Sequence, residues 1–424
     1  MTQSPASGSL DADPLASLAG VQRRTMIVLV ITQIVGTVGV GVAPSIGILL
    51  AEEVTHSEMW AGLARTASTL GAAVFGLPLG NLAARRGRRL ALAAGWWIAG
   101  VGAAILVAAA QWSLVIPLFV GLLLIGAGAA VSLQARFAAT DLARPHHKGR
   151  ALSTVVWFGT LGTVIGPNLG APGKVVGAAT GLTVFAAAFL IAAVFLVLAG
   201  TIVFLTLRPD PLLVLAERVG TPTTTRKVGL RERLRAMGAE MGGNRPARVA
   251  VVAILTGQIV MVAIMTMTPV HIVHHGGDID IVGITLSIHI AGMFAFSPIV
   301  GWLTDRSGPR PAIWAGIAIL LASLVIAAVW PEDTAWVMTS LFLLGLGWCF
   351  TNVAGSALFT STVSTDVRAS SQGGVDALSN LLGAVAAFGA GPLLAASSFP
   401  ALSVLTMVAL VPLCVLAARP LPAS

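Results

Sequence analysis

Two short basic stretches, GNLAARRGRR at residues 80–89 and GWLTDRSGPR at residues 301–310, decide how this chain is organised. Each stretch stands between two long apolar runs, and each combines glycine with at least two arginines. Arginine-rich connections of this length hold the ends of neighbouring membrane helices on the cytoplasmic side of a bilayer. The two stretches therefore predict a chain of helices that crosses a membrane repeatedly and returns to the same side at both points.

The composition of the whole chain agrees with this interpretation. Of 424 residues, 56% are hydrophobic and only 10% are charged, whereas a soluble domain carries about 25% charged residues, so a soluble enzyme is excluded. A helix of about 20 apolar residues with its connection needs about 35 residues, and the length therefore predicts an all-α membrane protein with twelve transmembrane helices. We expect these spans near residues 26–50, 58–82, 90–110, 113–137, 150–170, 176–207, 248–274, 280–303, 311–330, 334–362, 369–398 and 400–419.

The distribution of charge predicts the topology. If both termini are cytoplasmic, all of the 25 lysines and arginines except Arg65 and Lys174 lie in inner loops, at inner helix ends or in the tails. The net charge of +8 thus indicates orientation in a bacterial-type cytoplasmic (inner) membrane, and we expect no nucleic-acid partner. The predicted domains are a cytoplasmic tail at 1–25, a six-helix bundle at 26–207, a cytoplasmic linker at 208–247 and a second six-helix bundle at 248–424. Residues 226–237 of the linker form either a basic amphipathic helix on the membrane surface or a solvated connection.

An internal repeat relates the two predicted bundles. The tetrapeptide TQIV at 32–35 returns as GQIV at 257–260, an offset of 225 residues, and the same offset relates Thr-Asp at 140–141 to Thr-Asp at 365–366. Duplicated helical units are typical of transporters that move one bundle against the other around a site at the membrane midplane. The repeat therefore predicts a pseudo-symmetric transporter.

The two basic stretches resemble the G-x-L-x-D-R-x-G-R-R signature of the major facilitator superfamily, and the resemblance extends over nearly the whole chain. It implies a secondary-active transporter that works by alternating access, as a monomer in the lipid bilayer, on a small substrate. It also implies that Asp305 of the second stretch takes part in gating, whereas the first stretch has Ala84 at the matching position, which puts the usual latch of that half in doubt. We expect no catalytic residues and no cofactor, since the chain contains no nucleotide-binding or hydrolase motif.

Few ionisable or amide groups lie within the predicted spans. Such groups are costly in a bilayer and are therefore site candidates. Asp376 could bind and release a proton, or face an inner vestibule. Arg65 could contact substrate or a gate, or extend to the outer membrane surface. Gln33 and Gln258, which are equivalent under the repeat, either line a cavity or form polar contacts between helices.

Methionine and histidine form a pattern in the seventh and eighth spans. Met261 and Met265 are four residues apart, as are His289 and Met293, so each pair shares one helix face. In an antiparallel hairpin Met265 and His289 would lie at the same depth, with Met261 and Met293 about 6 Å deeper. Thioethers and imidazole suit Cu(I), although methionine is also a common apolar gap-filler. At the outer end of the seventh span, capture of metal is predicted for Met267, His271, His274 and His275.

The spacing of M-x-x-x-M and H-x-x-x-M resembles the CcoA-like copper importers of the superfamily, and this resemblance implies Met261, Met265, His289 and Met293 as copper ligands. The favoured substrate is therefore imported copper, as Cu(I). Two alternatives stay open. One is proton-coupled efflux of organic compounds or drugs, indicated by the Gly166-Pro167 element of the fifth span and dependent on Asp376. The other is uptake of a small metabolite such as riboflavin.

Overall fold

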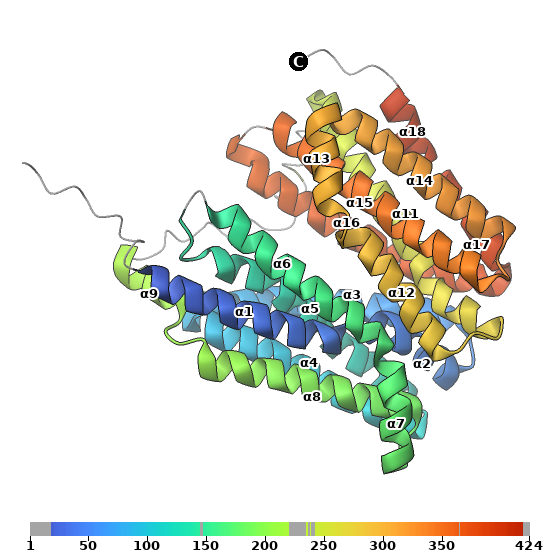
Figure 1. Ribbon diagram of the computed structural model, residues 1–424, viewed down its shortest axis with the longest axis horizontal. Coiled ribbons are helices and arrows are strands. Elements are labelled where there is room, and N and C mark those ends of the chain that lie inside the picture. The colour runs from blue at the N-terminus through green and yellow to red at the C-terminus, as the bar shows by residue number, and fades with distance from the viewer. Residues whose placement is uncertain are drawn as a thin grey trace, which may run out of the picture.

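The computed structural model describes residues 18–144, 147–219, 242–363 and 365–418, together with residues 235 and 238. Every regular element in these parts of the chain is a helix. Eleven helical stretches are long and apolar enough to cross a bilayer, and the predicted fifth span is helical but broken into three pieces. The predicted all-helical membrane fold with two bundles of helices is confirmed (Figure 1). The predicted basic helix of the linker lies, apart from residue 235, outside the described residues.

The N-terminal bundle begins with a long rod that is interrupted by a π-helical turn containing Pro44. Proline removes a backbone donor and bends a helix. The elements of this bundle are α1 Ala19–Val40, the π turn η2 Ala43–Gly47, α2 Ile48–Thr55, α3 Glu58–Arg86, α4 Arg88–Trp112, α5 Val115–Thr140, α6 Lys148–Ile165, the 3-10 turn η4 Gly166–Leu169, α7 Gly170–Thr180 and α8 Val184–Thr206, followed by the short α9 Pro211–Val219.

The C-terminal bundle repeats this plan with different breaks. Its second and last spans are each divided into two helices, with a proline in the first turn of α13 and at the second residue of α18. The elements are α11 Arg245–His274, α12 Ile279–Phe294, α13 Ser297–Ser307, α14 Pro309–Val329, α15 Thr334–Thr362, α16 Thr365–Ala396, α17 Phe399–Val408 and α18 Val411–Ala418.

The fifth and sixth spans differ from their predicted bounds of 150–170 and 176–207. The fifth span continues through η4 and α7 to Thr180, and the sixth begins only at Val184. Gly181 ends the fifth span, because it adopts φ +75°, a conformation that glycine reaches without steric cost. The residues after Pro167 are mostly small, and this composition does not indicate that the helix continues to Thr180.

Each bundle has its own interior. One buried cluster consists of residues between Val28 and Leu207, and a second consists of residues between Ala247 and Leu413. A third cluster lies mainly in the C-terminal bundle but includes Ile48, Leu49 and Ala61 of the N-terminal bundle. The two bundles therefore share buried apolar surface where α2 and the start of α3 meet the C-terminal bundle.

The bundles meet at one end of the molecule and diverge toward the other, as Figure 1 shows. We call the meeting end the acidic end, because the helix ends and connections there carry Glu52, Glu58, Asp278 and Asp280. The basic end has the connections after α3, α5 and α13, and arginines lie in these connections and at the adjoining helix ends. This arrangement places the candidate site between the bundles, in the half nearer the acidic end.

Candidate functional site

Helices α3 and α16 make a close contact between the bundles. The Thr66 hydroxyl donates a hydrogen bond to the Ala384 carbonyl oxygen at 3.1 Å. One turn earlier, Gly62 lies so close to α16 that a Cβ atom there would be 2.2 Å from the Ala387 carbonyl oxygen. Small residues allow this approach of two backbones, so the contact depends on the absence of a side chain at residue 62.

A second contact joins the fifth span to α12. The Asn168 side-chain amide donates to the Ser287 hydroxyl at 2.6 Å, and the Ser287 Oγ lies 2.7 Å from the Val164 carbonyl oxygen. Asn168 reaches α12 because it lies in the 3-10 turn η4, where the helix changes direction. The Gly166-Pro167 element of the sequence thus positions a polar contact between the bundles.

Charged side chains close the rim of the acidic end. The Lys174 ammonium group of α7 lies 2.6 Å from an Asp280 oxygen and 3.4 Å from an Asp278 oxygen. Asp278 also caps α12, and its bond from the Ile281 backbone N–H, aided by Lys174, lowers the pKa of its carboxyl group below the usual value. Since these pairs are exposed, each contributes little stability by itself.

The histidines predicted for metal capture each have other partners. His274 contacts Glu52 through Nε2, and its Nδ1 lies 3.2 Å from Glu58. The His271 Nε2 donates to the Pro331 carbonyl oxygen at 2.6 Å, and its ring stacks on a phenylalanine of α17. No cluster of three or more His, Cys, Asp or Glu side chains suited to a metal occurs among the described residues. Metal capture by Met267, His271, His274 and His275 stays a prediction.

Arg65 of α3 and His289 of α12 belong to different bundles and are close enough to interact electrostatically. The Arg65 guanidinium of α3 is enclosed by protein but keeps part of its surface accessible, and it interacts electrostatically with the His289 ring of α12. Among the residues that the structure describes, none forms an ion pair or side-chain hydrogen bond with this guanidinium. A charged donor group without a partner deep in a membrane protein is expected to contact a ligand.

His289 is fully buried, and only one of its two ring nitrogens has a hydrogen-bond partner in the described structure. Its Nδ1 donates to the Leu341 carbonyl oxygen of α15 at 2.8 Å. Because a carbonyl can only accept, the proton is on Nδ1, and Nε2 of the neutral ring is an acceptor. Nε2 is buried and has no partner in the described structure.

The predicted methionine ligands lie in apolar surroundings. Met261 and Met265 are 4% and 5% exposed and belong to the buried cluster shared between the bundles, against which Met293 also packs. Helix α12 packs mainly on α15 and on the fifth span, and less on α11. The three methionines therefore lie in one cluster, and Leu341, the hydrogen-bond partner of His289, belongs to the same cluster.

Gln33 and Gln258 make equivalent contacts in the two bundles. The Gln33 amide donates to the Ser132 hydroxyl of α5 at 2.5 Å. The Gln258 oxygen accepts from the Trp348 indole N–H of α15 at 2.9 Å. Both glutamines thus connect the first and fourth spans of their bundle, as the repeat requires of equivalent positions.

Asp376 of α16 is exposed and interacts electrostatically with Arg136 of α5, across the two bundles. The Arg136 Nε is buried without a partner among the described residues. The sequence pattern groups Arg136 with the topology anchors and does not indicate this relation. The sequence does offer one indication of a role for Arg136: the residue lies inside the predicted fourth span, at 113–137, and not in the loop that follows.

Comparison with known proteins identifies the family. The sequence profile of the Major Facilitator Superfamily matches residues 25–279 and 249–424. The chain belongs to the major facilitator superfamily. A solved structure shares the fold: a bacterial homologue of the human lysosomal transporter Spinster, inward-facing and unoccupied, gives a TM-score of 0.69 at 17% identity over 96% of this chain and 100% of that one.

Relatives within the superfamily do not support the CcoA-like copper subgroup. The uncharacterised transporter YdeG of Bacillus subtilis (strain 168) is 39% identical over 90% of this chain and 88% of its own. The riboflavin transporter RfnT of Brucella anthropi is 29% identical over 92% of this chain and 94% of its own. These relatives support the conclusion that the chain is a transporter of the superfamily. They do not identify its substrate.

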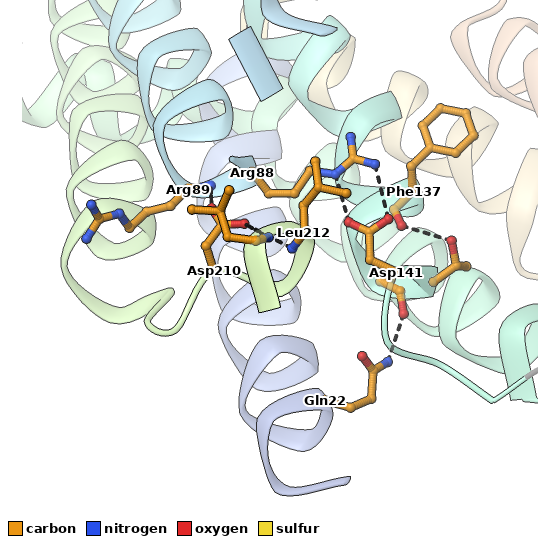
Figure 2. A network of polar contacts seen from close by, with 10 residues as sticks. Gln22, Arg88, Arg89, Phe137, Asp141, Asp210 and Leu212 are labelled. Carbon is orange, nitrogen blue, oxygen red and sulfur yellow. Dashed lines mark hydrogen bonds and ion pairs between the residues drawn. The ribbon is translucent and has the colours of Figure 1, made fainter. Parts of the chain in front are cut away.

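The superfamily loops of the two halves differ in an unexpected way. Asp305, at the end of α13, is exposed, and none of the described residues forms an ion pair with it. In the other half, where Ala84 replaces the aspartate, Arg88 forms an ion pair with Asp141 at 2.8 Å, and Asp210 accepts from the Arg89 backbone N–H at 2.7 Å (Figure 2). Two distant carboxylates therefore hold the loop that lacks its own. Gating by Asp305 stays a prediction.

Proposed function

We propose that this member of the superfamily moves a small organic solute across the cytoplasmic membrane by alternating access. The observation that carries the proposal is the partly accessible Arg65 guanidinium, which has no ion-pair or side-chain hydrogen-bond partner among the described residues and lies between two bundles that meet closely at the acidic end (Figure 1). With the basic end in the cytoplasm, as the lysines and arginines predict, the arrangement corresponds to an inward-facing state. The acidic end would open in the other state.

The favoured solute class is that of flavins. Support comes from the riboflavin transporter relative, which matches almost the whole chain, and from the free guanidinium of Arg65. Flavins offer ring carbonyl oxygens as acceptors and a large apolar surface, which suits a site of methionines with a few polar groups.

The test is uptake of riboflavin by proteoliposomes and rescue of a riboflavin auxotroph. As a matched control, riboflavin uptake by the double variant Asn168→Cys, Ser287→Cys is measured before and after its two cysteines are cross-linked. These side chains meet across the bundles at 2.6 Å, so the cross-link should hold the acidic end closed. Uptake should occur in the reduced protein and stop in the cross-linked one. No riboflavin uptake by the wild type would refute the flavin proposal.

Copper is the second candidate, because the unpaired Nε2 of His289 is an acceptor of the kind that binds metals. The nearby Arg65 charge opposes it, since a cation next to a guanidinium in a medium of low dielectric is strongly repelled. If copper is carried, the double variant Met261→Leu, Met265→Leu should lower cellular copper at equal protein level. Unchanged copper content would refute this candidate.

Asp376 is the proposed coupling group, because it is the acidic member of a pair that spans the bundles. Asp376→Asn should abolish uptake driven by a proton gradient and retain exchange of internal for external solute. Full gradient-driven uptake by Asp376→Asn would refute coupling at this residue.

A further inference from the structure

Arg65 occupies a position at which it can reach the solute. Ala61, one turn earlier on the same face of α3, is buried in the cluster that contains Met261 and Met265 of the other bundle. Thr66, the next residue, contacts α16. Arg65 therefore lies on the part of α3 that meets the other bundle, and part of its side chain remains accessible.

His289 is held rigidly between α12 and α15, within range of the Arg65 charge. Helices α12 and α15 approach so closely that a Cβ atom on Gly345 would lie 2.2 Å from the His289 carbonyl oxygen. The Nδ1 bond to Leu341 then fixes the rotation of the ring. The unpaired Nε2 is consequently an acceptor held in a constant position, within range of the Arg65 charge.

The two unsatisfied groups complement each other. A guanidinium has five N–H donors in one plane and no acceptor. One N–H given to Nε2 would satisfy the imidazole and orient the plane, and the remaining donors would point to the space between the bundles. Such a fork matches two coplanar oxygen acceptors better than any other group.

We propose that Arg65 is the substrate-contacting residue for a planar oxygen acceptor of the solute, a carboxylate or a ring carbonyl, and that His289 is the residue that positions it. This inference rests on the proposed function, because it names the chemical group that the transported organic solute presents. Other acidic residues of the described chain have their own partners: Glu52 and Glu58 contact His274, and Asp376 interacts electrostatically with Arg136.

The first experiment measures KM and kcat for riboflavin uptake in four variants. Arg65→Gln removes the charge and should raise KM about tenfold or more, because hydrogen bonds to charged groups are strong. Arg65→Lys keeps the charge without the fork and should fall between Arg65→Gln and the wild type. His289→Leu should raise KM, and His289→Gln, which restores an acceptor oxygen, should recover it in part. The control Arg150→Gln removes an exposed arginine in the first turn of α6, outside both signature stretches, and should leave KM unchanged.

A KM for Arg65→Gln equal to that of the wild type, with riboflavin transported, would overturn this inference and leave the proposed function intact. A loss of kcat alone in His289→Leu, with no recovery in His289→Gln, would show a merely structural histidine and overturn its positioning role.

A second experiment separates failure of the inference from failure of the flavin proposal. The purified wild type and Arg65→Gln are heated with nicotinate, uridine, riboflavin or the organic cation tetraphenylphosphonium. If riboflavin is inert but nicotinate or uridine raises Tm of the wild type and not of Arg65→Gln, the flavin proposal fails and the inference stands. If no oxygen-acceptor probe raises Tm, or only the cation does, the inference is overturned.

Discussion

Replacing Gly62 by alanine is expected to open the acidic end of the transporter. The new Cβ would lie 2.2 Å from the Ala387 carbonyl oxygen, whereas ordinary contact begins at 3.4 Å, so α3 and α16 must separate by about 1.2 Å. Overpacking of this kind costs about 1–3 kcal/mol, and the cost falls only on the state in which the acidic end is closed. The ratio of closed to open molecules should therefore fall about 5- to 150-fold.

The assay is the rate of cross-linking between cysteines placed at Asn168 and Ser287, which meet only when the acidic end is closed. Gly62→Ala should slow this reaction at least fivefold. Gly76→Ala is the matched control on the same helix, because a Cβ there meets nothing within 4 Å. It should cross-link like the parent protein. Equal rates for Gly62→Ala and Gly76→Ala would refute the reasoning that the close approach of α3 and α16 maintains closure.

Two further predictions concern stability. Asp210→Ala removes the acceptor for backbone N–H groups in the first turns of α4 and α9 and should lower the free energy of unfolding by about 1–2 kcal/mol. The Tm of the protein in detergent should therefore fall. The control Glu217→Ala replaces an exposed acid on α9 and should leave Tm unchanged. The pKa of Asp278 is lowered from 3.8, chiefly by the Ile281 N–H, so its charged form stabilises the fold above that pH and this stabilisation is lost as pH falls through the lowered value. The Tm difference between wild type and Asp278→Asn should accordingly stay constant between about pH 7 and 5 and shrink only as pH falls below 3.8; a difference that disappears already near pH 5 would contradict this assignment.

The spans and their division into two bundles could be predicted, because apolar length and the placement of arginine act locally along the chain. The positions at which individual spans break into shorter helices were harder to predict. The fifth span runs to Thr180 because the left-handed Gly181 stops it, and one glycine among 47 gives no such signal. The break between α12 and α13 has a proline, but prolines also occur inside the continuous α3 and α11.

The sequence predicted which residue types form the candidate site better than it predicted which residues interact with each other there. Spacing identified His289 as a buried group with Met261 and Met265 nearby, and composition identified Arg65 as an exceptional charge. Their relation depends on how α3 and α12 rotate and approach, which is set by packing between bundles. The replacement of the missing aspartate at Ala84 by Asp210, more than a hundred residues later, is likewise a tertiary contact that no local pattern contains.

The separate interiors of the two bundles have a consequence for the connection between them. Each bundle buries its own cluster, and the described residues of these clusters lie outside the connection 208–246. Besides the contacts of Asp210 with α4 and α9, the connection raises the effective concentration of one bundle around the other. Two halves produced as independent polypeptides in one bilayer should therefore reassemble through the acidic-end contacts, with an activity that depends on the abundance of both, and the covalent connection removes that dependence.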